Sequence, residues 1–262
     1  MLFRSAYPDL TSIPDEVEHA FIMVPREAVA EAMRQCVEKK VITATVYSDG
    51  FAETGDEGRR MQAEVMKIAQ EGGVRVLGPN CIGILSIRPS LALSVNAVLE
   101  MDSIKPGPFA IVSQSGSMTG GLLSRGLGRG VGFSKLISVG NEADIGVGEL
   151  TDMLVDDPNT GAILLFLETL RDADRLGHAA RRAYAANKPV IVYKLGRSDL
   201  GQDLAASHTG ALAGADEVAD QFFRANGMLR VEMLETLFEL PALLQGQKPA
   251  KRHRVEIGRA HV

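Results

Sequence analysis

The stretch PFAIVSQSGSMTGG, residues 108–121, decides the fold. Its apolar run at residues 109–112 is typical of a buried strand. Small polar residues follow at 113–117, and a glycine-rich helical pattern begins near Met118. A strand, a tight turn and a helix in this order form the start of a βαβ unit.

Short strand-like runs alternate with longer helical patterns on both sides of this unit. The expected strands are residues 20–24, 41–47, 74–77, 109–112, 133–139, 162–167 and 190–193. The expected helices are residues 27–40, 56–71, a segment from 117, 147–155, 173–186, 213–226 and 234–244. This alternation predicts an α/β chain with two doubly wound parallel-sheet domains.

An irregular stretch interrupts the alternation after residue 77 and ends in KPGP at residues 105–108. We therefore expect a first domain at residues 1–104 and a second at 105–245. The first domain is expected to lack an N-terminal strand and a glycine-rich turn, because residues 1–13 hold turn residues but no complete strand. Residues 246–262 are expected to be a non-native or disordered tail, since residues 256–262 resemble a translated sequencing adapter.

Composition excludes several function classes. The 262 residues are 45% hydrophobic and carry a net charge of -5, with acidic and basic residues interspersed. This charge pattern argues against nucleic-acid or membrane-surface binding. Two cysteines are too few for a disulfide framework, and no apolar run has the length of a membrane span. A cytoplasmic protein with small-molecule or protein partners is expected.

The loop at residues 113–117 follows the strand of the opening stretch. Its small residues allow backbone N–H groups to approach an anion at a helix N-terminus, where the helix dipole is positive. Phosphate is the natural ligand of such a loop. The alternative is an ordinary serine N-cap that binds no ligand.

A single histidine, His208, lies in the sequence SHTGALAG at residues 207–214. Its small neighbours leave the ring accessible, and an imidazole can attack phosphorus when a carboxylate holds its other nitrogen. Glu168, at the end of an apolar strand, is the candidate carboxylate. The alternatives are a structural or solvated histidine and a solvated strand-end glutamate.

Two further loops follow expected strands. Gly140 and Asn141 suit a close approach to a ligand, and residues 78–83 form a rigid turn around Cys81. Cys81 and Cys36 are interpreted as small buried hydrophobes without a nucleophilic role. The sequence contains no recognisable metal-ligand cluster and no Ser-His-Asp spacing.

Taken in order, these segments resemble the α subunit of succinyl-CoA synthetase and, more closely, the ADP-forming acetate-CoA ligases. Both are acyl-CoA synthetases of the NDP-forming kind. The resemblance covers roughly residues 7–245 and implies an incomplete Rossmann-like CoA-binding domain followed by a flavodoxin-like ligase domain. It implies that His208 is a phosphohistidine oriented by Glu168. It also implies phosphate contacts at Ser113, Gln114, Ser115, Gly116, Ser117, Gly140 and Asn141, and CoA contacts at Tyr47, Ser48, Asp49, Asn80 and Cys81.

The implied reaction interconverts acyl-CoA, phosphate and NDP with the acid, CoA and NTP through an acyl phosphate and the phosphohistidine. The resemblance implies that ATP/ADP or GTP/GDP, with magnesium, binds an ATP-grasp domain or β subunit, and that the protein is oligomeric. No Gly-x-x-x-x-Gly-Lys-Ser/Thr loop occurs in the chain, so we expect this chain alone to be inactive. Relatives that act on succinate carry a tyrosine where this chain has Gly120, which disfavours succinate.

Two other functions remain as alternatives. One is a non-catalytic CoA-binding or regulatory module, as in the synthetase-like part of certain protein acetyltransferases. The intact histidine sequence argues against it, because such relatives commonly lose that histidine. The other is a fragment of a Rossmann dehydrogenase, which the absence of a Gly-x-Gly-x-x-Gly turn with a later acidic residue disfavours.

Overall fold

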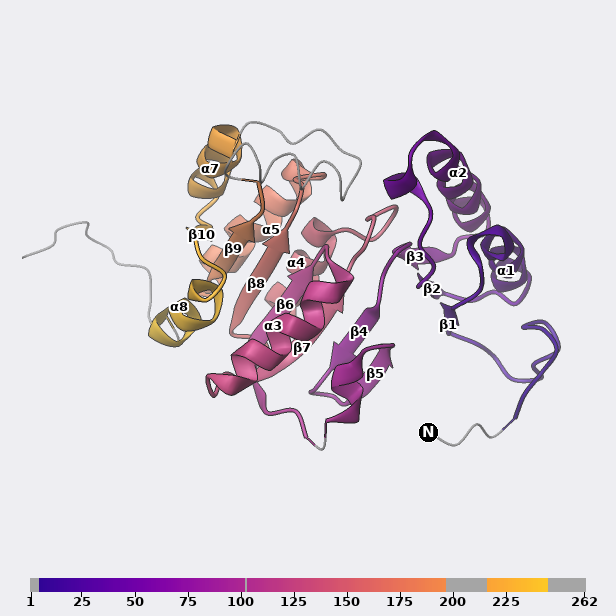
Figure 1. The fold of residues 1–262 in the computed structure, drawn as a ribbon, viewed down its shortest axis with the longest axis horizontal. Helices are drawn as coiled ribbons and strands as arrows, with labels where there is room; N and C mark the ends of the chain where they lie inside the picture. The colour runs from indigo at the N-terminus through magenta and orange to yellow at the C-terminus, as the bar shows by residue number, and fades with distance from the viewer. Residues whose placement is uncertain (1–4, 102, 197–215, 245–262) are drawn as a thin grey trace, which may run out of the picture.

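The computed structural model describes residues 5–101, 103–196 and 216–244. These residues form two α/β domains that lie side by side (Figure 1). The first contains a parallel three-stranded sheet in the order β1-β2-β3. Its strands are β1 (His19–Ile22), β2 (Thr43–Val46) and β3 (Arg75–Leu77), and its helices are α1 (Arg26–Glu38), α2 (Asp56–Glu71) and the short η1 (Ala52–Thr54).

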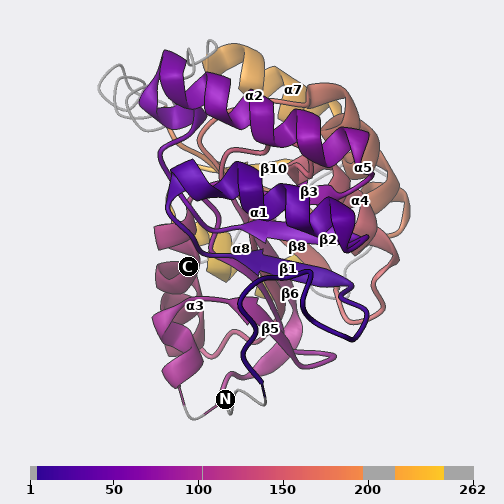
Figure 2. The ribbon, with the colours of Figure 1, turned by 90° about the vertical axis from the view of Figure 1, so that its right-hand side faces the viewer.

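Helices α1 and α2 cover one face of the first sheet (Figure 2). On α1 the buried residues Val29, Met33 and Cys36 follow a helical spacing, so that one stripe of the helix faces the sheet. On α2 the buried residues Val65 and Ala69 are also spaced so that one stripe of the helix faces the sheet. These side chains form one apolar cluster with the strands. The helices therefore lie on the side away from the second domain (Figure 1).

The second domain contains a seven-stranded sheet in the order β10-β9-β8-β6-β7-β4-β5. Strands β6 (Pro106–Ser113), β7 (Phe133–Ser138), β8 (Ala162–Leu167), β9 (Val190–Lys194) and β10 (Leu229–Val231) run parallel. Helices α3 (Gly116–Gly128) and α8 (Thr236–Leu244) cover one face, and α4 (Val147–Asp156), α5 (Ala173–Ala185) and α7 (Asp216–Ala225) cover the other.

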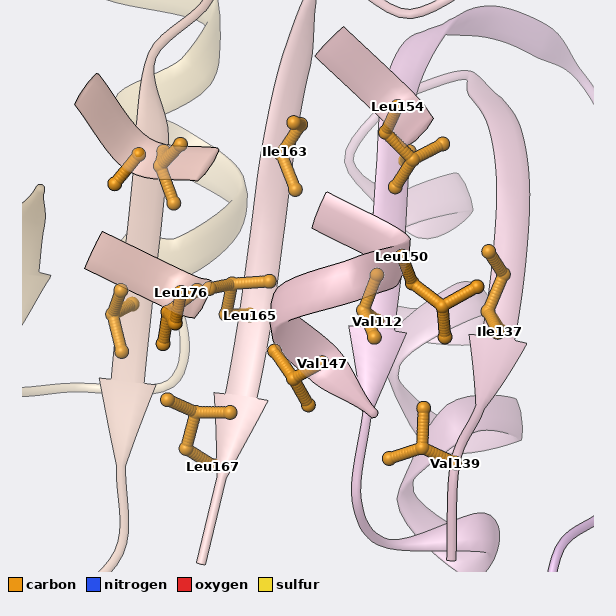
Figure 3. Close-up of a cluster of buried hydrophobic side chains, with 14 of the residues drawn as sticks. Val112, Ile137, Val139, Val147, Leu150, Leu154, Ile163, Leu165, Leu167 and Leu176 are labelled. Carbon is orange, nitrogen blue, oxygen red and sulfur yellow. The ribbon is translucent and has the colours of Figure 1, made fainter. Parts of the chain in front are cut away.

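The apolar residues of this sheet alternate between the two faces. Val112, Leu165 and Leu167 face α4 and α5 (Figure 3), whereas Ile111 and Leu164 face α3 and α8. Strand β8 is buried at all six positions, as expected for a central parallel strand covered by helices on both faces. The C-terminal ends of β6, β7 and β8 consequently meet at one edge of the sheet.

The α/β fold with two parallel-sheet domains is confirmed, and every expected strand and helix is present over its described residues. Strands β4 (Gly83–Ser86), β5 (Leu91–Ser94) and β10 and the short helices η1 and η2 (Ala97–Glu100) were not expected. The β4–β5 hairpin pairs antiparallel with β7. The chain thus enters the second sheet at Gly83, before the boundary expected at residue 105. The expected tail lies outside the described residues.

Candidate functional site

The loop at residues 113–117 turns from β6 into α3. Ser115 is the N-cap residue, because its Oγ accepts a hydrogen bond from the N–H of Met118 at 3.4 Å. Ser113 is fully buried and donates from Oγ to the carbonyl of Ser115 at 2.8 Å. The N–H groups of Gly116 and Ser117 belong to the first helical turn, where no earlier carbonyl can accept their hydrogen bonds. The loop can therefore offer N–H donors and a positive helix end to an anion.

The side chain of Gln114 connects this loop to the end of β8. Its Oε1 accepts hydrogen bonds from the N–H groups of Glu168, at 2.6 Å, and Thr169, at 2.9 Å. Its Nε2 donates to the carbonyl of Thr169 at 2.9 Å and to the Glu142 carboxylate. Both amide hydrogens are therefore used within the protein. The Gln114 side chain orients the backbone of the site and has no hydrogen left for a phosphate ligand.

Glu142 is a buried carboxylate that sequence reasoning did not identify as a site residue. Its Oε1 accepts the Gln114 hydrogen bond, and its Oε2 accepts from the N–H of Val147, the first residue of α4, at 2.8 Å. Burial raises the pKa of Glu142, and these two hydrogen bonds oppose that rise. In the sequence, the only sign that Glu142 belongs to the site was its position in a strand-end loop, five residues before a helix start.

The first domain contributes loops after β2 and β3. Ser48 donates from Oγ to the carbonyl of Val24, and its own carbonyl accepts from the N–H of Asn80 at 2.9 Å. Cys81 is 1% exposed and donates to the carbonyl of Ser138, in the second domain, at 2.9 Å. Burial raises the pKa of Cys81 to about 12. A thiol with this pKa is protonated at neutral pH, which agrees with its interpretation as a structural residue.

Asn141, in the loop after β7, contacts the first domain through its side chain and backbone. Its Nδ2 donates to the Glu53 carboxylate and, at 3.0 Å, to Oε1 of Gln62. Its backbone N–H donates to the carbonyl of Pro79 at 3.0 Å. The preceding residue, Gly140, has φ +58°, and a Cβ there would lie 2.2 Å from the Pro79 oxygen. The two domains therefore approach each other closely at this loop.

An ion-pair network reinforces the contact between the domains. Arg75 on β3 donates to both carboxylate oxygens of Asp144, at 2.9 and 3.1 Å, and to Glu149 on α4 at 2.9 Å. Asp144 also accepts from the N–H of Val76 at 2.8 Å. The loops of the two domains are thus held together by backbone and side-chain contacts.

These loops enclose a cavity of about 490 Å³ between the domains. Expected site residues from both domains line it: Tyr47, Ser48, Asp49, Asn80, Cys81, Gln114, Ser115, Gly116, Ser117, Gly140, Asn141 and Glu168. Ser113 does not line the cavity, because it is buried behind the loop. His208 lies outside the described residues. A cavity of this size suits a small-molecule ligand.

Several cavity residues were missed by sequence reasoning: Met23, Val24, Pro25, Arg26, Ile82, Thr169 and Arg171. Arg26 and Arg171 supply cationic groups to a cavity for which sequence reasoning had identified none. Arg26 is the first residue of α1, in the connection that follows β1, and Arg171 lies in the loop after β8. Their position at a strand end was a usable signal, but arginine is also common on solvated helix starts and loops.

Comparisons with known proteins match both domains. Residues 106–244 match the family model described as the succinyl-CoA ligase like flavodoxin domain, and residues 1–86 match a CoA binding domain. The α subunit of acetate-CoA ligase (ADP-forming) I from Pyrococcus furiosus is 37% identical over 89% of this chain and 49% of the relative. The 4-hydroxybutyrate-CoA ligase (ADP-forming) of Nitrosopumilus maritimus is 30% identical over 91% of this chain and 34% of the relative.

A solved structure has the same architecture. The dinucleotide-forming acetyl-coenzyme A synthetase 1 of Ca. Korarchaeum cryptofilum, in complex with phosphate and ADP, superposes with a TM-score of 0.86 at 32% identity, covering 95% of this chain and 52% of that chain. This chain therefore spans about half the length, or less, of these relatives. The domain matches, the fold and the sequence similarity together place the chain in the family of NDP-forming acyl-CoA synthetases.

Proposed function

We propose that this chain is the CoA-binding and phosphohistidine part of an NDP-forming acyl-CoA synthetase. The observation that supports this most strongly is that strand-end loops of both domains line one cavity together. Its lining includes loops of the domain that matches a CoA binding domain, together with the start of α3 and Glu168 of the second domain. An enzyme that joins CoA to an acyl phosphate needs both kinds of binding surface side by side.

The phosphate end is the start of α3. The N–H groups of Gly116 and Ser117 offer hydrogen bonds to phosphate oxygens, and the helix dipole favours negative charge there. Arg171 adds a guanidinium group to the lining of the same cavity. In this proposal the side chains of Ser113 and Gln114 shape the loop from behind, because their hydrogen bonds are made within the protein.

In the proposed reaction, phosphate attacks the acyl carbonyl of acyl-CoA, and the bond to sulfur breaks to release CoA and an acyl phosphate. The Nε2 or Nδ1 of His208 then takes the phosphoryl group and releases the carboxylic acid. Glu168 holds the second imidazole nitrogen and stabilises the positive charge that develops on the ring. The phosphohistidine transfers its phosphoryl group to ADP or GDP, bound with magnesium on an ATP-grasp domain or β subunit.

The acid is one without a second carboxylate. A Cβ at Gly120 would lie 2.9 Å from Oδ1 of Asn96, so the tyrosine of succinate-specific relatives would require the Asn96 side chain to move. The names of the relatives include acetate and 4-hydroxybutyrate, both monocarboxylates. A monocarboxylate therefore fits both the local packing and the sequence similarity.

The whole reaction is not expected from this chain alone, but the proposal can be tested with it, because the first half of the reaction needs no nucleotide. The purified chain is incubated with radiolabelled phosphate and a panel of acyl-CoAs. We expect an acid-labile, base-stable phosphoryl group on His208. The variant His208→Asn should carry no label, whereas the exposed His178→Asn on α5 should be labelled like wild type. Equal labelling of the His208→Asn variant would refute the assignment.

A further inference from the structure

Asn141 is fixed in the cavity wall by contacts on three sides. The residue is 7% exposed, and its N–H donates to the carbonyl of Pro79 at 3.0 Å. Its side-chain nitrogen, Nδ2, donates to both Glu53 and Gln62 on the first domain. An amide nitrogen has two hydrogens, so these two bonds use its whole donor capacity.

The neighbours of Asn141 determine which end of its amide faces them. The Glu53 carboxylate can only accept hydrogen bonds, and its other oxygen accepts from the N–H groups of Gly50 and Phe51 at 2.6 and 3.1 Å. Gln62 Oε1 also accepts from the N–H of Ala52 at 3.4 Å, which fixes the orientation of the Gln62 amide. Two acceptors therefore face Asn141, and only its nitrogen can satisfy both.

The Oδ1 atom of Asn141 has no hydrogen-bond partner among the described residues, and Asn141 lines the cavity. The geometry points to an acceptor in the cavity wall. We infer that Asn141 Oδ1 accepts a hydrogen bond from an N–H or S–H donor of CoA, and that Glu53 and Gln62 are the residues that position it. This inference rests on the proposed function, because it assumes that CoA occupies the cavity.

The chemistry of the two ligands supports this assignment over a phosphate contact. Phosphate presents mainly acceptor oxygens at neutral pH, so an amide oxygen opposite them would repel it. The pantetheine arm of CoA carries two amide N–H groups and ends in a thiol, and each of them is a donor. The cavity thus offers N–H donors to phosphate at the start of α3 and an acceptor to CoA at Asn141.

Ligand discrimination tests the inference. Binding of CoA, desulfo-CoA and inorganic phosphate is measured by calorimetry on the full chain and on the Asn141→Ala and Glu53→Gln variants. Loss of one hydrogen bond at about 1.4 kcal/mol corresponds to about tenfold weaker CoA binding in Asn141→Ala, with phosphate binding unchanged. Glu53→Gln should also weaken CoA binding. A glutamine has only one acceptor oxygen, which cannot accept hydrogen bonds from Asn141 and from the N–H groups of the loop together. Glu38→Gln, an exposed residue on α1, is the matched control.

Desulfo-CoA identifies the donor. An equal loss with CoA and desulfo-CoA assigns an N–H donor, and a loss confined to CoA assigns the thiol. Unchanged CoA binding in Asn141→Ala, or a loss for phosphate instead, would overturn the inference while leaving the proposed function intact. Thermal melts of both variants show whether they fold. A purely structural role of Asn141 would weaken the binding of CoA and of phosphate alike. If the wild-type chain binds no CoA, the proposed function fails and the inference fails with it.

Discussion

Replacement of Gly140 by alanine should disrupt the contact between the domains. Gly140 has φ +58°, a conformation that residues with a Cβ adopt at a cost of about 1–2 kcal/mol. An added Cβ would also lie 2.2 Å from the carbonyl oxygen of Pro79 and 2.3 Å from that of Asn80. Both are backbone atoms, so neither overlap can be relieved by rotation of a side chain.

Relief of these overlaps requires the two loops to separate. Separation breaks the hydrogen bond from the N–H of Asn141 to the carbonyl of Pro79, which contributes about 1 kcal/mol. With the conformational strain and the residual overlap, Gly140→Ala should lower the free energy of unfolding by about 3 kcal/mol. CoA and phosphate binding should weaken together, since Gly140 lies in the wall of the shared cavity.

Gly121→Ala is the matched control. Gly121 lies within α3, and a Cβ there would contact no other atom within 4 Å. Because alanine is the better helix former, this variant should be more stable than wild type by up to about 1 kcal/mol. Urea unfolding followed by far-UV circular dichroism measures both variants. Equal stability of Gly140→Ala and wild type would refute the close approach of the two loops.

Three further outcomes are expected. Asp144→Ala leaves the N–H of Val76 without its acceptor and should lower the free energy of unfolding, measured by urea unfolding, by about 1–2 kcal/mol. Arg34→Ala breaks only exposed ion pairs and should change it by less than about 0.5 kcal/mol. Burial lowers the pKa of His19 below its usual 6.5, so the unfolded chain binds the proton more tightly than the folded one. The free energy of unfolding should therefore fall as pH drops below about 6.5, and His19→Gln should flatten this part of the pH profile. Native Cys81 should resist alkylation at pH 8 and react after unfolding, because burial raises its pKa to about 12.

The elements that the sequence predicted are those with a strong period or a long apolar run. Strand β8 has six consecutive apolar residues, and α1 repeats its buried positions at helical spacing. The β4–β5 hairpin was missed because each strand has four residues and β5 is partly exposed, which weakens the apolar pattern. Its place beside β7 depends on pairing between distant segments, which periodicity does not encode.

The candidate site was predicted as a set of loops but not as a set of contacts. Parallel strands end at one edge of a sheet, so the loops after β2, β3, β6, β7 and β8 could be expected to meet a ligand. Which of their side chains are free to do so depends on tertiary hydrogen bonds. Gln114 was expected to hold phosphate, yet its amide links the end of β6 to Glu168 and Thr169. The same reasoning could not find Glu53, because its partner Asn141 is 88 positions away.

The contacts between the domains bear on how the proposed enzyme would work. Three backbone hydrogen bonds, from Asn141, Ala143 and Ile145 to the loop and strand at residues 76–79, hold the second domain against the first beside the cavity. Since these contacts are made within the protein, a ligand that spans the cavity meets loops that are already in position. Less ordering then accompanies binding, and the reacting ends of CoA and acyl phosphate are held at a fixed separation. The residues that join the domains are therefore expected to affect the rate of acyl transfer even where they contact neither ligand.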